Sequence, residues 1–276
     1  MVGAVASFMI MAICARELSN TMNTFQILFL RSLVGFAIIF LMVIKGGTTF
    51  SYTKRFKIHI FRNVLHYVAQ AGWVLGVTLL PLATVFAIEF TAPIWVAIMA
   101  VLFLKENMDR GRLVAILFGF CGTLIILRPG LEAFEVGSLA VLLASVGLAA
   151  AYVFTKFLSK TETPLTIVYY MTGIQALVGL LPGLFFWATP NQADFIWIGA
   201  IGIVGLTSHF CLAKALTYAD ATAVIPFDFL RLPLAAVVGF FFYQEAFELA
   251  VLVGGVVIFA GNYYNIHTET RPKPVP

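Results

Sequence analysis

The sequence predicts an all-α integral membrane protein with ten transmembrane helices, arranged as two inverted five-helix repeats. Three observations lead to this fold class. Of the 276 residues, 61% are hydrophobic and only 11% are charged, whereas about a quarter are charged in a typical soluble domain. The apolar residues fall into ten runs, and short motifs recur in the two halves of the chain. So few charges cannot cover the surface of a soluble domain of this length.

The ten apolar runs have the length that a bilayer requires, which is about 20 residues per helix. Pro81 separates the third run from the fourth, because one helix over 61–104 would be longer than the bilayer is thick. Residues 1–15 lack the basic leader of a signal peptide, so we expect the first run to remain as a helix. Nine spans is the alternative, since the first run is ambiguous. The expected spans are 2–18, 23–44, 61–80, 83–104, 111–128, 137–157, 165–187, 194–216, 222–243 and 248–266.

The positions of the basic residues predict the orientation of these spans. If the N-terminus is cytoplasmic, thirteen of the 17 Lys and Arg residues, Arg62 among them, fall on the cytoplasmic side, in connections or near the ends of spans. Only Arg16 and Arg128 fall on the opposite side. Because cytoplasmic connections carry an excess of Lys and Arg, we expect both termini in the cytoplasm.

The halves 1–130 and 131–276 contain an internal repeat, and we expect them to form one integrated transport domain. Each half has five spans, an odd number, so the halves are expected to lie upside down relative to each other. Inverted repeats are typical of secondary transporters, whose halves exchange conformations to open alternate sides. The matching motifs are Ala15–Ser19 with Thr155–Ser159 and Pro93 with Pro233 at an offset of 140, and Leu104–Glu106 with Tyr243–Glu245 and Gly122 with Gly261 at an offset of 139.

Several of these motifs resemble those of a known family. The segments Leu80–Thr84, Phe90–Pro93 and Leu104–Glu106, together with Phe29–Ser32, are similar to the EamA-type members of the drug/metabolite transporter (DMT) superfamily. The resemblance covers nearly the whole chain. It implies a five-plus-five helix fold, a location in the plasma (inner) membrane and a central cavity lined mainly by spans 1, 3, 4, 6, 8 and 9. The substrate remains open among amino acids, nucleotide-related compounds, vitamins, organic acids and amines.

Charged side chains inside the spans are the main candidates for a binding site, because each costs about 3 kcal/mol or more at the bilayer centre. Glu89 in span 4 and Asp228 in span 9 are counterparts at the repeat offset of 139. Pro93 has no N–H to bond the carbonyl of Glu89, so a free carbonyl is expected beside the carboxylate. Glu89 is therefore predicted to bind a cationic group or a proton, with a purely structural kink as the alternative.

Two arginines within spans have roles that the sequence leaves open. Arg231 lies three residues after Asp228 on the same helix face, so a stabilising ion pair and a substrate contact are both possible. If Arg231 instead faces the cavity with Glu89, the site suits a zwitterion or a carboxylate. Arg31 in span 2 is predicted to be a structural charge, with a role in coupling as the alternative.

Span 3 carries a polar and aromatic stripe at helical spacing, formed by Asn63, His66, Gln70 and Trp73. Within a membrane such a face is expected to turn away from lipid. Trp73 suits stacking on a planar group or contact with a cation. His66 suits proton coupling or an interhelical hydrogen bond. Tyr152 in span 6 is added as a weaker candidate for the substrate site.

These residues favour a secondary active transporter that moves a small polar metabolite, such as an amine, zwitterion or amino-acid-like compound, by alternating access. Coupling to protons and exchange of substrates are both open. The alternatives are a carrier of an organic anion, a nucleoside-like or a vitamin-like metabolite, and a channel or sensor. Nucleophile, metal and phosphate-loop motifs of common enzymes are missing from the sequence, so no enzyme, cofactor, metal or nucleic-acid partner is expected. The expected partners are a small-molecule substrate and the lipid bilayer.

Overall fold

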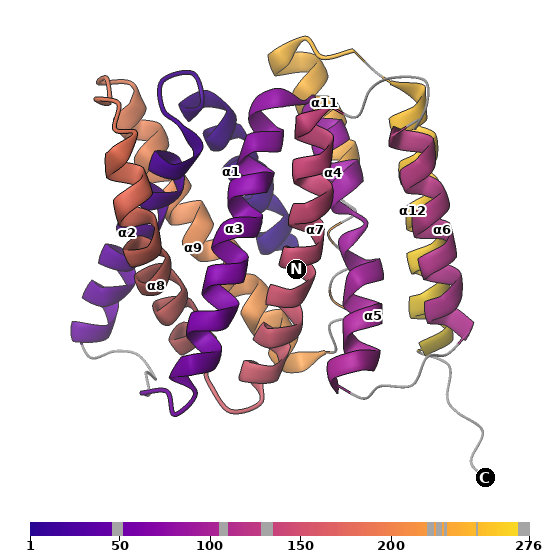
Figure 1. Cartoon of the computed structure of the whole chain (residues 1–276), viewed down its shortest axis with the longest axis horizontal. Helices are drawn as coiled ribbons and strands as arrows, with labels where there is room; N and C mark the ends of the chain where they lie inside the picture. The colour runs from indigo at the N-terminus through magenta and orange to yellow at the C-terminus, as the bar shows by residue number, and fades with distance from the viewer. Residues whose placement is uncertain are drawn as a thin grey trace.

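The computed structural model describes residues 1–45, 52–104, 110–127, 135–219, 224, 228, 231–246 and 248–269. The secondary-structure elements in these ranges are all helices, and they stand side by side as a bundle (Figure 1). The helices are α1 (Val2–Leu18), α2 (Thr24–Ile44), α3 (Phe56–Leu79), α4 (Leu82–Glu89), α5 (Ala92–Leu104), α6 (Arg110–Leu127), α7 (Val136–Ser159), α8 (Pro164–Phe185), α9 (Asp194–Tyr218), α11 (Arg231–Tyr243) and α12 (Leu249–Glu269).

The all-helical prediction is confirmed, and a described helix occupies each of the ten expected positions when α4 and α5 are counted as one span. Five of these segments are long and apolar enough to cross a membrane by themselves, and the segment Leu82–Met99 is one of them. The predicted boundary between the halves, at residues 130 and 131, lies outside the described residues. The orientation of the termini stays a prediction.

The fourth span was expected over 83–104, and in the structure two helices, α4 and α5, form it. α4 ends at Glu89 and α5 begins at Ala92, because Pro93 has no N–H to continue the helical bonding. The Thr91 hydroxyl donates to the Ile88 carbonyl at 2.9 Å and also contacts the Ser145 hydroxyl of α7 at 2.8 Å. The break therefore places Glu89 at a helix end that is fixed against α7.

The third span was expected to begin at residue 61, but α3 begins at Phe56. Arg62 therefore lies within α3, near its start, and it is 3% exposed. Its guanidinium donates to the Thr155 hydroxyl at 3.1 Å and to the Asn63 amide oxygen at 2.6 Å. The side of the membrane on which this end of α3 lies stays a prediction.

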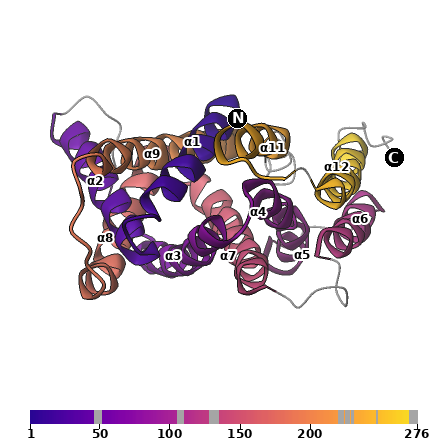
Figure 2. The same cartoon turned by 90° about the horizontal axis from the view of Figure 1, so that it is seen from above.

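Seen from above, the bundle has a central group of helices between two outer pairs (Figure 2). α6 packs against α12 at one end, and α2 packs against α8 at the other. Between them lie α1, α3, α4, α7, α9 and α11, with α3 packed on α7 and α1 packed on α9. The central group is therefore shielded from lipid by its neighbours at both ends.

Glycines set the distance between α6 and α12. A Cβ added at Gly122 would lie 2.6 Å from the Gly254 carbonyl oxygen and 2.5 Å from Ile258 Cγ1, and a Cβ at Gly254 would lie 2.6 Å from the Gly122 carbonyl oxygen. Contacts this short force the helices apart, and overpacking typically costs about 1–3 kcal/mol. We expect Gly122→Leu to lower the thermal unfolding temperature of the purified protein. Gly199→Leu is the control, because a Cβ at Gly199 meets nothing within 4 Å; equal losses for both variants would contradict this reading of the interface.

Candidate functional site

A narrow cavity lies within the central group of helices. Its lining comes from six helices, which are the six spans implied by the resemblance. A smaller cavity shares Glu89, Tyr152 and Arg231 with it and adds Phe90, Ala92, Pro93 and Asp228. The residues of the larger cavity are Phe8 and Met11 of α1, His66, Gln70 and Trp73 of α3, Glu89 of α4, Leu148 and Tyr152 of α7, His209 of α9 and Arg231 of α11.

A buried charge cluster joins the two cavities. Arg231 donates from Nη2 to Glu89 Oε1 at 3.0 Å and also lies 3.1 Å from Asp228 Oδ2. The three residues are 2–4% exposed. Arg231 therefore pairs with Asp228, three residues earlier in the chain, and also reaches Glu89 across the bundle.

Aromatic side chains complete this cluster. The Trp73 indole N–H donates to Glu89 Oε2 at 2.7 Å. The Arg231 guanidinium lies over the rings of Phe8, Phe86 and Phe90, at 4.9, 5.0 and 5.8 Å from the ring centroids. These ring faces attract cations, so they stabilise the guanidinium in a site from which water is largely excluded.

The Glu89–Arg231–Asp228 cluster has a net charge and polar atoms that a ligand can bind. Two carboxylates and one guanidinium leave one net negative charge when all three are ionised. Arg231 Nε and both Asp228 oxygens have no hydrogen-bond partner within the described part of the chain, because the 3.1 Å contact has the geometry of a charge contact only. A buried polar atom without a partner is costly, and a ligand with a cationic group would balance the charge and could donate to the Asp228 oxygens.

A second polar cluster lies on the other side of the same cavity. Arg31 of α2 donates to the amide oxygens of Gln70 and Gln175, at 2.5 and 2.9 Å. The Gln70 amide nitrogen lies 3.1 Å from His66 Nε2 and 3.3 Å from His209 Nε2. The Gln175 amide nitrogen lies 2.9 Å from His66 Nδ1. All five side chains are buried, at 0–5% exposure.

The structure thus brings most of the predicted candidates to one place. Asn63 is the exception: it is on the expected face of α3, but it bonds Arg62 and lines neither cavity. Arg31 does not line the cavity itself; it lies behind Gln70 and donates a hydrogen bond to its amide oxygen. The predicted candidates that line at least one of the two cavities are Glu89, Asp228, Arg231, Trp73, Tyr152, His66 and Gln70.

The candidates selected from the sequence do not include Gln175 or His209. Both are buried polar residues in otherwise apolar helices, and that signal is the one used to select Glu89. The apolar lining residues Phe8, Met11 and Leu148 had no signal in the sequence, because such residues are equally common on faces that contact lipid.

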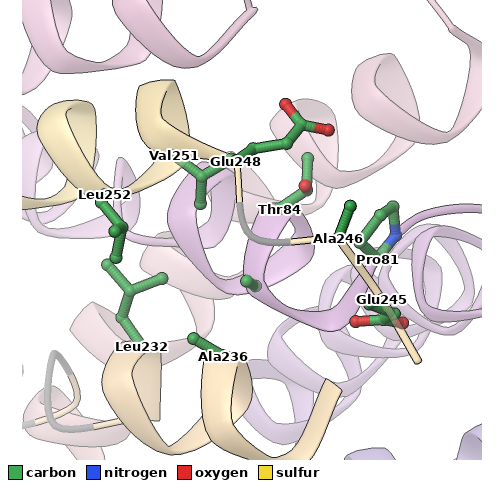
Figure 3. Close-up of a pocket in the computed structure, with 10 residues that line it drawn as sticks. Pro81, Thr84, Leu232, Ala236, Glu245, Ala246, Glu248, Val251 and Leu252 are labelled. Atoms are coloured by element: carbon green, nitrogen blue, oxygen red, sulfur yellow. The ribbon is translucent and has the colours of Figure 1, made fainter. Parts of the chain in front are cut away.

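A network at one end of the bundle links both halves of the chain. Arg16 donates to Glu245 Oε1 at 3.1 Å and also bonds the Leu80 carbonyl. The second Glu245 oxygen accepts from the Leu82 N–H at 2.9 Å. Glu245 lies beside Pro81 at the edge of a small pocket, whose other side carries Glu248 (Figure 3). Glu245 therefore caps the start of α4.

The comparisons with known proteins agree on one family. The model of the EamA-like transporter family matches residues 1–128 and 135–266. An S-adenosylmethionine uptake transporter of Rickettsia bellii is 27% identical over 259 residues, which cover 94% of this chain and 89% of the relative. A riboflavin transporter of Brucella anthropi is 30% identical over 235 residues, which cover 83% of each chain. A pseudopaline exporter of Pseudomonas aeruginosa is 26% identical over 254 residues, 91% of this chain and 89% of the relative.

A chain of known crystal structure supports the fold independently. It superposes with a TM-score of 0.70 over 95% of this chain and 94% of its own, at 14% sequence identity. The match of the family model to nearly the whole chain, together with the transporter names of its relatives, excludes the enzyme alternative. This chain belongs to the EamA-like transporter family of the DMT superfamily, and it is a multi-pass membrane transporter of small molecules.

Proposed function

We propose that this protein is a secondary active transporter of the plasma (inner) membrane that carries a small metabolite with a cationic group by alternating access. The observation that carries the proposal is the Glu89–Arg231–Asp228 cluster on the central cavity. It has one negative charge in excess, and the Trp73 indole fixes one carboxylate by a hydrogen bond. A cationic or zwitterionic ligand matches this charge.

The packing of the bundle supports the inverted repeat on which alternating access depends. The repeat offset of 139–140 residues relates α1 to α7 and α3 to α9. The contact of α3 with α7 then has the contact of α1 with α9 as its counterpart, and both pairs are packed. Each of the outer pairs, α2 with α8 and α6 with α12, joins a helix to its own counterpart. The two halves thus offer matching surfaces for a rocking motion.

S-adenosylmethionine is the first compound to test. The relatives named for its uptake match 94% of this chain, and its sulfonium and amino groups are the cationic groups that the cluster lacks. Its planar adenine also suits a cavity bounded by Trp73, Phe8 and Tyr152. The proposed coupling is exchange of substrates or movement of a proton on Glu89 or Asp228.

The test is thermal stabilisation of the purified protein by a panel of compounds, followed by uptake into proteoliposomes. The panel contains S-adenosylmethionine, riboflavin, amino acids, simple amines, quaternary ammonium compounds, organic acids and nucleosides. We expect stabilisation by S-adenosylmethionine or another cationic or zwitterionic compound, and saturable uptake of that compound. Stabilisation by anions or by riboflavin alone would overturn the proposed substrate class, and flux that does not saturate would favour a channel.

A further inference from the structure

The second polar cluster (the Arg31 cluster) has more hydrogen-bond donors than acceptors. Its members are Arg31, Gln70, Gln175, His66 and His209. A guanidinium has only donors, so the amide oxygens of Gln70 and Gln175 face Arg31 and their NH₂ groups face the imidazoles. Both ring nitrogens of His66 therefore lie opposite amide donors. A neutral imidazole has one acceptor nitrogen and a protonated one has none. A neutral His66 can thus accept from only one of the two amides; His209 Nε2, at 3.3 Å, offers Gln70 a second acceptor, but protonation of His66 would leave the Gln175 amide without one.

The same cluster also has an unbalanced charge. Arg31 is 5% exposed, and in the part of the chain that the structure describes its contacts are the two amide oxygens and the sulfur of Met11, at 3.7 Å. Two amide oxygens and a thioether do not neutralise a buried guanidinium. The surroundings are nonetheless built to hold the side chain: a Cβ at position 205 would lie 3.1 Å from Arg31 Cγ and Cδ, and Gly205 leaves that space free.

Three members of this cluster, His66, Gln70 and His209, form one wall of the cavity, and Glu89 and Trp73 are on the same cavity. Resting on the proposed function, we infer that this wall is a second subsite, which binds a carboxylate of the transported molecule. Arg31 supplies the positive charge through Gln70, and the amide and imidazole N–H groups supply the hydrogen bonds. The cavity is then bipolar, with the Glu89 cluster holding the cationic group of a zwitterion and the Arg31 cluster holding its carboxylate.

This assignment gives His66 a role different from the proton coupling that its sequence position suggested. The groups that face it are the amide nitrogens of Gln70 and Gln175 and the ring of His209, at 4.9 Å between ring centroids. Arg31, Arg62 and His209 contribute the electrostatic field around it. None of these groups stabilises an added positive charge, so His66 acts as a neutral donor and acceptor, and its proton stays in place during transport.

The first test needs no substrate. In a protein with Cys14, Cys121 and Cys211 replaced by Ser, Met11→Cys places a thiol beside Arg31, and Trp73→Cys places one beside Glu89. Each thiol is treated with an anionic and a cationic methanethiosulfonate reagent of similar size. For each thiol we compare the reaction rate of the anionic reagent with that of the cationic reagent. We expect this ratio to be about tenfold higher at Met11→Cys than at Trp73→Cys, since one buried charge changes such ratios by about this factor. Adding Arg31→Gln is expected to remove the difference. Equal preferences at both thiols, or no reaction at either, would overturn the subsite.

The second test compares S-adenosylmethionine with its decarboxylated form, which keeps the sulfonium. We expect Arg31→Gln and Gln70→Met to weaken binding of S-adenosylmethionine by about tenfold or more, because charge-assisted hydrogen bonds are lost. Binding of the decarboxylated compound should change by less than about twofold. Arg62→Gln is the matched control, a buried arginine that bonds Thr155 and Asn63 and has no contact with Gln70 or Gln175. Gln70→Met retains Arg31, so it tests the carboxylate subsite if Arg31→Gln does not fold.

The two proposals fail in distinguishable ways. If neither compound binds, the proposed substrate class is wrong, and the reagent test still decides whether the wall attracts anions. If both compounds bind equally well and Arg31→Gln affects them equally, the cationic site stands and the carboxylate subsite is wrong.

Discussion

Glu89→Gln is expected to weaken binding of cationic compounds by about a hundredfold while the protein remains folded. The substitution removes the negative charge that the cluster has in excess, and buried contacts with charged groups contribute about 1.5–3 kcal/mol each. The shape of the site is kept, because the glutamine oxygen still accepts from the Trp73 indole N–H and Arg231 still lies beside Asp228. The loss is therefore expected in binding, with little change in the thermal unfolding temperature.

The measurement is isothermal titration of wild type and variant with S-adenosylmethionine and with S-adenosylhomocysteine, which has the same skeleton without the sulfonium charge. Wild type should prefer the charged compound, and Glu89→Gln should lose that preference. Asp228→Asn is the control, because it removes an equal charge from the smaller cavity but has no contact with Trp73. It is expected to have the smaller effect. An unchanged preference in Glu89→Gln would exclude Glu89 from the cation site.

Most of this site could be predicted from the sequence, because a charge inside an apolar span has few explanations. Glu89, Asp228 and Arg231 were selected on that ground alone, and the structure places them within one cluster. The stripe on α3 was equally informative. His66, Gln70 and Trp73 recur at helical spacing, and all three line the cavity.

The sequence was less informative about partners across helices. It offered two roles for Arg231 and could not choose, since the choice depends on how α4 and α11 pack. The sequence placed Arg62 at the start of the third span, and only the structure shows that α3 begins at Phe56 and that Arg62 is buried. Arg31 appeared to be a structural charge, and its link to the cavity wall became visible only through Gln70 and Gln175.

The largest expected effect outside the cavity is on the closure of one end of the bundle, through Glu245. Its carboxylate bonds Arg16 of α1 and the first N–H of α4, while its own backbone N–H returns to the Gly239 carbonyl at 3.0 Å. The turn before it is held by Gln244 at a φ of 54°, and a Cβ at Gly239 would lie 2.2 Å from the carboxylate. A neighbouring bond, from the Tyr243 hydroxyl to Glu17 at 2.8 Å, joins the same helices. One carboxylate thus connects three elements from both halves of the chain.

Under alternating access these connections are expected to break when the cavity opens toward the face on which Arg16 lies. Glu245→Gln removes the ion pair and weakens the bond to α4, so the open form should become about tenfold more populated, since the side chains are largely buried. We expect the thiol of Met11→Cys to react about ten times faster with an impermeant reagent added from that face. Gly239→Ala displaces the same carboxylate and should act in the same direction. Glu248→Gln is the control: Glu248 lies across the same pocket, with its carboxylate directed away from Glu245 (Figure 3). Equal reactivity in Glu245→Gln and Glu248→Gln would show that the network holds helices in place without controlling access.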